Sequence, residues 1–194
     1  MTFKWPRRVL AILLMPVMAW IAPAAAVVEI NDNVERYVIS GATAAALRHE
    51  MNTKGPQGVG RRFDGFTKWH VSWRWRYQSS GAGCVIESVR TTVTVNTTLP
   101  RWQDEHRADH ATQQRWARYL SALEHHEEGH RRNGVAAGHD IDQIVATMPP
   151  AASCDALGAN ANALGKSIIQ KYVQRDVDYD RDTRHGVTQG AQFP

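Results

Sequence analysis

The chain has 194 residues, of which 43% are hydrophobic, enough for one compact domain with a buried core. It carries 23 basic and 19 acidic residues, but three of the basic ones, Lys4, Arg7 and Arg8, lie in a segment that the mature protein is expected to lose. The 20 basic and 19 acidic residues that remain nearly balance, which gives no indication of a nucleic-acid partner.

Residues 1–26 have the layout of a secretory signal peptide. The basic start is followed by an apolar run from Val9 to Ile21 and by small residues at the expected cleavage site, Ala24-Ala25-Ala26. The run is shorter than the roughly 20 residues that span a bilayer, which argues against an uncleaved membrane anchor. We therefore expect an exported protein, periplasmic or secreted, with a single domain over residues 27–194 that is free of the membrane.

The first expected elements after this segment are short. Tyr37-Val38-Ile39 is typical of a strand, and residues 44–51 are expected to form a helix with Thr43 as its N-cap. A glycine-rich stretch over residues 52–60 ends that helix.

The strongest strand pattern runs from Phe66 to Tyr77, where apolar and polar residues alternate. Its apolar face consists of Trp69, Val71, Trp73, Trp75 and Tyr77. This face is interpreted as core packed under helices, and the alternative is that part of it forms the floor of a substrate groove. A second strand over residues 85–99, ended by Pro100, would complete an antiparallel hairpin whose edge could bind an extended peptide.

Helical periodicity begins at Thr112. Its apolar stripe is expected to weaken at Gly134 and Gly138, to resume afterwards, and to end at Pro149-Pro150. A further helix is expected over residues 154–173, and the polar tail over residues 179–194 is interpreted as a loop. The prediction is an α+β fold, in which a small antiparallel sheet packs against helices.

Cys84 and Cys154 are the two cysteines of the chain. In an exported protein such a pair predicts a disulfide, which would join the β half to the α half and stabilise the fold by about 2–4 kcal/mol. The alternative is two free buried thiols.

The sequence His126-Glu127-Glu128-Gly129-His130 has the HExxH pattern. Two histidines four residues apart lie on one face of a helix, so that both imidazoles can bind one Zn²⁺ ion beside the glutamate. Both fall on the apolar stripe, where ionisable groups are costly unless they are paired or bind metal. The competing interpretation is a polar helix face with accidental spacing.

A catalytic zinc site needs a third protein ligand. Asn133 and Ala136 occupy the positions where one known pattern has its glycine and histidine, and no glutamate follows Glu128. We favour His185, in a tail that can fold back, with Asp180 as the second choice. The other possible ligands after the motif are His139, Asp140, Asp142, Asp155, Asp176, Asp178 and Asp182.

This motif, preceded by Trp116 and followed by the segment from Tyr179 to Gly186, resembles a bacterial family of unknown function described as predicted secreted zinc-dependent proteases. The resemblance covers most of the mature chain, including the Trp-rich strand and Cys84. It implies a zincin-like hydrolase with its motif positions at His126, Glu127, His130 and His185.

The resulting hypothesis is a secreted zinc metallopeptidase that cleaves peptide or protein substrates. Glu127 would act as general base, Tyr179 would donate to the tetrahedral oxyanion or simply pack, and Asp180 could orient a metal-binding imidazole. The alternative is an exported, non-catalytic binding or envelope-structural module with a vestigial or structural metal site. The alternative is based on the aromatic face and on the opposite, basic face with Arg74 and Arg76.

Overall fold

The computed structural model describes residues 27–58, 60–81 and 83–194. The expected signal peptide, residues 1–26, lies outside the described residues. Among the helices of the described part of the chain, none is long and apolar enough to cross a bilayer.

Three long strands form one sheet, with β1 (Val27–Ile39) and β2 (Phe66–Ser80) on either side of β3 (Gly83–Trp102). The pairing of β2 with β3 is antiparallel, which confirms the predicted hairpin. β1, however, runs parallel to β3 along its whole length, so the sheet is mixed and the expectation of an antiparallel sheet was wrong for this strand. The fold class is α+β, as predicted.

Pro100 lies within β3 and does not end it, contrary to expectation. The pairing with β2 stops at Thr98, and from there β3 pairs with β1 alone. The missing N–H of Pro100 therefore leaves no bond to β2 unmade, which is the condition under which strands tolerate proline.

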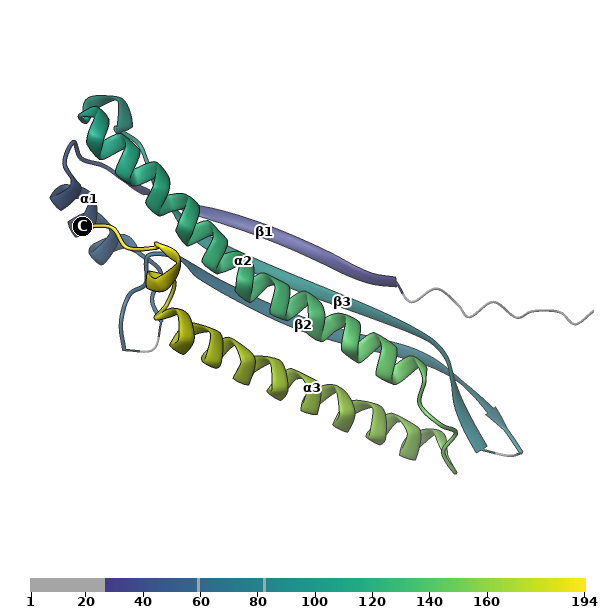
Figure 1. The fold of residues 1–194 in the computed structure, drawn as a ribbon. Helices are drawn as coiled ribbons and strands as arrows, with labels where there is room; N and C mark the ends of the chain where they lie inside the picture. Colours follow the sequence, from purple (N-terminus) through teal and green to yellow (C-terminus); the bar gives the residue numbers. More distant parts are fainter. Residues whose placement is uncertain (1–26, 59, 82) are drawn as a thin grey trace, which may run out of the picture.

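Three helices accompany the sheet: α1 (Ala44–Lys54), α2 (His110–Ala146) and α3 (Cys154–Thr183). α2 lies along the sheet and α3 returns antiparallel beside it (Figure 1). The Thr43 side chain accepts a hydrogen bond from the Ala46 amide, which confirms the predicted N-cap of α1. Short 3-10 turns over Glu105–Arg107 and Val187–Gln189 complete the fold.

The glycines of α2 strengthen its contact with the sheet. A Cβ atom at Gly134 would lie 2.5 Å from Cγ of Trp69, and one at Gly138 would lie 2.3 Å from Cγ2 of Val93. Both positions need glycine so that the helix can approach the strands closely. This packing offsets the helix penalty of about 1 kcal/mol per glycine, and α2 continues uninterrupted to Ala146.

α3 extends ten residues beyond the predicted end and includes the first part of the expected loop. Its last turns are charged but remain helical, and Nη1 of Arg181 lies 2.6 Å from Oδ1 of Asp178, three residues earlier. After the helix the chain folds back toward α1, where Ala191 and Phe193 enter the core.

The core consists of two apolar clusters at opposite ends of α2. The first contains Ile39, Leu47, Met51, Leu99, Trp102, Trp116, Tyr119, Leu123, Ala191 and Phe193. The second contains Val71, Val93, Val95, Ala137, Ile141, Val145, Ala161, Ile168 and Tyr172. Between them, α2 carries four buried polar residues, His126, Glu127, His130 and Asn133. The motif therefore occupies the interval between two packed regions.

The aromatic face of β2 packs against the second cluster through Trp69, Trp73 and Trp75, which confirms its interpretation as core for these residues. For Tyr77 the interpretation was wrong, because this side chain follows a shift in strand register and is exposed. Part of the same face, including Trp69 and Trp73, also lines a cavity of about 430 Å³ beside Ile169 and Val173 of α3.

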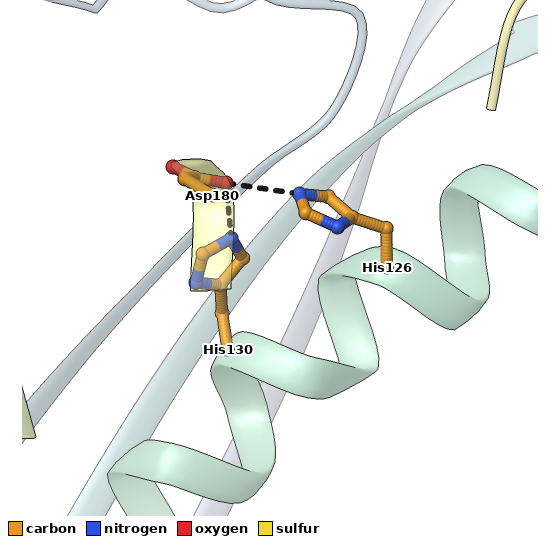
Figure 2. A group of neighbouring side chains, drawn as sticks. All are labelled: His126, His130 and Asp180. Atoms are coloured by element: carbon orange, nitrogen blue, oxygen red, sulfur yellow. Dashed lines mark hydrogen bonds and ion pairs between the residues drawn. The ribbon is translucent and has the colours of Figure 1, made fainter. Parts of the chain in front are cut away.

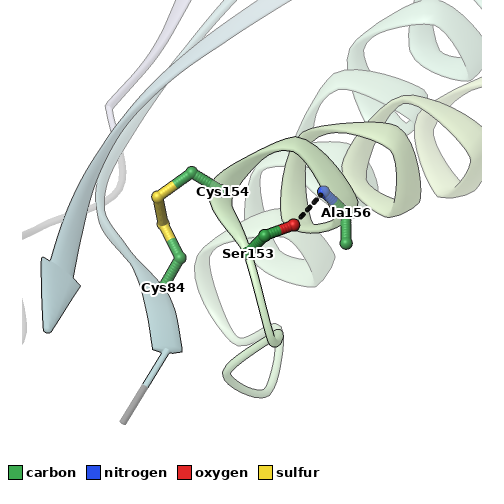
Figure 3. Close-up of a disulfide and its surroundings, with 4 residues drawn as sticks. All are labelled: Cys84, Ser153, Cys154 and Ala156. Atoms are coloured by element: carbon green, nitrogen blue, oxygen red, sulfur yellow. Dashed lines mark hydrogen bonds between the residues drawn. A yellow bond between two sulfur atoms is a disulfide. The ribbon is translucent and has the colours of Figure 1, made fainter. Parts of the chain in front are cut away.

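The disulfide between Cys84 and Cys154 is present and joins the start of β3 to the start of α3 (Figure 3). Two backbone hydrogen bonds between Cys84 and Ala151 lie beside it. The predicted covalent connection between the β half and the α half is thus confirmed.

Candidate metal centre

Two imidazoles from α2 and one carboxylate from α3 meet at a single point. Oδ1 of Asp180 lies 3.1 Å from Nε2 of His126 and 3.1 Å from Nε2 of His130 (Figure 2). Both histidines are buried, with exposed fractions of 3% and 8%. The helical spacing of four residues brings the two rings together, and the antiparallel packing of α3 on α2 brings the carboxylate to them.

The remaining ring nitrogens are held by separate acceptors. Nδ1 of His126 lies 2.9 Å from Oε1 of Gln189, and Nδ1 of His130 lies 3.0 Å from Oδ1 of Asp176. When these contacts hold a proton on each Nδ1, the lone pair of each Nε2 is directed toward Asp180, which is the tautomer that binds a metal ion there.

Asp176 is itself fixed by two donors. The indole N–H of Trp69 and the amide Nδ2 of Asn133 each lie 2.6 Å from one of its carboxylate oxygens. The orientation of the His130 ring therefore depends on residues from β2, α2 and α3 together.

This donor set fits a metal ion of the zinc type. His126, His130 and Asp180 each offer one atom that could bind a metal ion, and these atoms lie within 4.8 Å of one another. Tetrahedral zinc with bonds of about 2.0–2.1 Å separates its nitrogen and oxygen ligands by roughly 3.3 Å, close to the observed 3.1 Å. Three converging lone pairs repel unless a cation or a proton lies among them, so the arrangement itself calls for positive charge.

In the metal-free protein a proton on His130 supplies that charge. Burial lowers the pKa of this imidazole, but its hydrogen bonds with Asp176 and Asp180 outweigh burial and raise the pKa to about 10. Burial likewise raises the pKa of Asp180, and the hydrogen bonds with His126 and His130 outweigh it and hold that pKa well below its usual range. Asp180 is therefore ionised at neutral pH.

Glu127 lies beside these residues and is 5% exposed. Burial raises the pKa of its carboxyl, against the opposing effects of a hydrogen bond from Thr67 and the charges of His130 and His126. Its Oε2 atom is buried and has no hydrogen-bond partner in the described part of the chain. A buried carboxylate oxygen without a hydrogen-bond partner is unusual in a folded protein.

The backbone at Gly65 lies directly against the carboxylate of Glu127. A Cβ atom at Gly65 would lie 2.9 Å from Oε1 of Glu127, so only glycine leaves the carboxylate in place. The loop that carries Gly65 is anchored by the adjacent Asp64, whose carboxylate binds the Arg48 guanidinium at 2.7 Å and the Tyr119 hydroxyl at 2.6 Å.

A pocket of about 370 Å³ opens over this group. His126, Glu127, His130 and Asp180 all line it, together with Asp176 and His185. The rest of its wall is formed by Arg61, Arg62, Phe63, Asp64, Gly65, Phe66, Thr67, Leu123, Arg184, Val187 and Ala191. The two imidazoles, Asp180 and Glu127 thus border one space that is open to solvent.

The structure places the two expected third ligands differently. Asp180, the second choice from the sequence, contacts both imidazoles directly. His185, the first choice, has its Nδ1 atom 3.2 Å from Oδ2 of Asp180, on the other oxygen of that carboxylate.

Tyr179 lies behind the histidines. Its ring stacks on that of His126 with 5.0 Å between centroids, and its hydroxyl lies 3.3 Å from the His126 carbonyl oxygen and 3.0 Å from Nε2 of Gln189. It is not among the residues that line the pocket. This position supports the His126 ring and does not present the hydroxyl to a substrate oxyanion.

Several residues of the site were not assigned from the sequence. Asp176 appeared there only as one of many possible third ligands, and Gln189, Thr67 and Gly65 had no recognisable signal. Each acts through contacts between elements that are distant in the sequence, and such contacts have no local pattern.

Comparison with known proteins gives one match. A family model described as "Bacterial protein of unknown function (DUF922)" matches residues 34–186, a span that includes the HExxH motif, Asp176, Asp180 and His185. No curated protein and no solved structure matches the chain.

Proposed function

The chain belongs to this bacterial family of unknown function, and we propose that it is an exported, zinc-dependent peptidase with a zincin-like catalytic domain over residues 27–194. One observation carries the proposal. Two imidazole nitrogens and a carboxylate oxygen converge beside a buried glutamate whose second oxygen is unpaired, all within one open pocket.

His126, His130 and Asp180 would hold the metal ion. Bound there, zinc would lower the pKa of a water molecule toward about 7 and polarise the carbonyl of the scissile peptide bond. Gln189 and Asp176 hold the imidazoles of His126 and His130 in the orientation that this requires.

Glu127 is the general base of the proposed reaction. Its carboxylate accepts a proton from the attacking water and returns it to the amine of the leaving group. The burial that raises its pKa makes it a better proton acceptor than an exposed glutamate. Gly65 and Thr67 restrict the position of the carboxylate.

His185 is assigned a supporting role. Its contact with Oδ2 of Asp180 orients that carboxylate so that Oδ1 is directed toward the two imidazoles. Tyr179 is assigned the role of supporting His126, because its ring stacks on the imidazole.

Two features favour an enzyme over an exported, non-catalytic module with a structural metal site. A third ligand lies at hydrogen-bond distance from both histidines. The pocket also runs past Glu127, whereas a structural site is normally closed by a fourth protein ligand.

The test is hydrolysis of a mixed peptide library by the zinc-loaded mature protein, read by mass spectrometry. Glu127→Gln should retain zinc and lose activity by about 100-fold or more, because the general base is removed. Glu128→Gln is the matched control, since this neighbouring side chain pairs with Arg131. Equal activity of wild type and Glu127→Gln would overturn the proposed mechanism.

A further inference from the structure

Three arginines lie on the wall of the pocket that contains the candidate metal centre. Arg61 and Arg62 come from the loop before β2, and Arg184 comes from the turn after α3. All three are exposed. Two separate segments of the chain thus contribute positive charge to the same pocket.

None of these arginines forms an ion pair with a carboxylate within the described residues. Nη1 of Arg62 donates to the Gly55 carbonyl at 2.6 Å, and the guanidinium of Arg61 lies 4.4 Å from the centre of the Phe63 ring. These contacts orient the side chains but leave their charge uncompensated.

Three of the acidic groups of the pocket, by contrast, already have partners. Asp64 binds Arg48, Asp176 contacts His130, and Asp180 contacts both imidazoles of the motif. Glu127, the fourth acidic group, is buried. The exposed charges of the pocket wall that have no partner among the described residues are therefore those of the three arginines.

The backbone that carries Arg184 is strained. Arg184 and His185 have φ angles of 51° and 52°, in the left-handed region that residues with a side chain rarely adopt. The turn is held by a hydrogen bond from the His185 amide to the Asp180 carbonyl at 2.8 Å. The turn places His185 against Asp180, and it places Arg184 on the pocket wall. The position of the arginine is therefore linked to that of the candidate metal centre.

We propose that Arg61, Arg62 and Arg184 bind a carboxylate of the substrate, so that the enzyme prefers peptides with a carboxylate near the scissile bond. Guanidinium groups bind carboxylates through paired, charge-assisted hydrogen bonds. The carboxylate belongs either to an aspartate or glutamate side chain or to the free C-terminus of a short peptide. This inference rests on the proposed peptidase function.

The first experiment compares matched peptides as substrates of the zinc-loaded protein. Amidated peptides that differ only in Glu or Gln at each position test a side-chain carboxylate, and the same Gln peptides with free or amidated ends test a terminal carboxylate. The anionic member of at least one pair should react about tenfold faster, the effect of one charge-assisted hydrogen bond, and high salt should reduce the difference. Equal rates within every pair would overturn the inference, even if hydrolysis itself is observed.

The second experiment uses the double variant Arg61→Gln/Arg184→Gln. It should lose the preference for the anionic peptide while it still cleaves the neutral one. Arg118→Gln, which changes an exposed arginine of α2 outside this pocket, should keep the preference. An unchanged preference in the double variant would contradict the assignment of the carboxylate site.

A measurement of peptide binding distinguishes failure of this inference from failure of the proposed peptidase function. Fluorescence anisotropy of labelled Glu and Gln peptides on zinc-loaded Glu127→Gln protein measures recognition without hydrolysis. If the wild type fails to cleave but the Glu peptide binds about tenfold tighter through Arg61 and Arg184, the carboxylate site stands and the peptidase function fails. If neither cleavage nor charge-dependent binding occurs, both fail.

Discussion

Oδ1 of Asp176 lies 3.0 Å from Nδ1 of His130, while Nε2 of the same ring lies 3.1 Å from Asp180. The ring is thus held between two carboxylates, one that orients it and one that would share a metal ion with it. This relationship makes Asp176 a positioning residue whose effect can be measured through the metal.

Asp176→Asn should weaken zinc binding by about 10–100-fold, because the neutral amide is a poorer acceptor for the proton on Nδ1. Competition with a chromophoric chelator measures the change. Asp178→Asn is the matched control on the same helix, since this carboxylate pairs with Arg181 outside the site. Equal zinc affinities for the two variants would contradict the role given to Asp176.

The stability of the metal-free protein should depend on His130. Its pKa is raised to about 10 in the folded chain, compared with about 6.5 in the unfolded chain. The stabilisation that the proton on His130 gives to the folded state is therefore complete below about pH 6.5 and is lost as the pH rises toward 10. Urea unfolding with a chelator present should show the free energy of unfolding decrease over this range more steeply in wild type than in His130→Gln. Parallel pH profiles for the two proteins would disprove the prediction.

Gly65→Ala should impair catalysis while zinc binding is retained. The new Cβ would lie 2.9 Å from Oε1 of Glu127 and 3.1 Å from Cδ1 of Leu123, so the glutamate has to move. We expect kcat for peptide hydrolysis to decrease by about tenfold or more, since catalytic groups tolerate little displacement. Gly81→Ala serves as control, because nothing lies within 4 Å of that position. Unchanged kcat in Gly65→Ala would show that this contact is not needed.

Removal of the disulfide should destabilise the fold without loss of zinc from the candidate metal centre. Cys84 and Cys154 are 70 residues apart in the sequence, and a loop of that length corresponds to about 4 kcal/mol in the chain-entropy account. The double variant Cys84→Ser/Cys154→Ser should melt about 10 °C lower in calorimetry, with its zinc content retained. An unchanged melting temperature would contradict this account.

The histidines of the site could be predicted from the sequence, whereas their partner Asp180 was ranked only second, after His185. His126 and His130 are four residues apart, so helical periodicity alone places both imidazoles on one face. Asp180 lies 50 residues beyond His130, and its position depends on the register between α2 and α3, which no local pattern specifies. Its polar surroundings also suggested a loop, whereas the structure continues α3 through them to Thr183.

The strands of the sheet, too, could be predicted only in part from the sequence. The alternation in β2 and β3 was strong enough to predict a hairpin, but most of β1 was missed. Residues 31–33, Asn-Asp-Asn, have low strand propensity. Their extended conformation is stabilised by parallel pairing with residues 94–96 of β3, a long-range contact that overrides local preference.

The most direct test of the central claim is the zinc content of the mature protein purified without chelators, measured by elemental analysis for the wild type, Asp180→Ala and His185→Gln. We predict one zinc ion per chain in the wild type, its loss in Asp180→Ala and its retention in His185→Gln. A wild-type protein without metal after incubation with zinc, or full zinc content in Asp180→Ala, would contradict the assignment of His126, His130 and Asp180 as the metal centre.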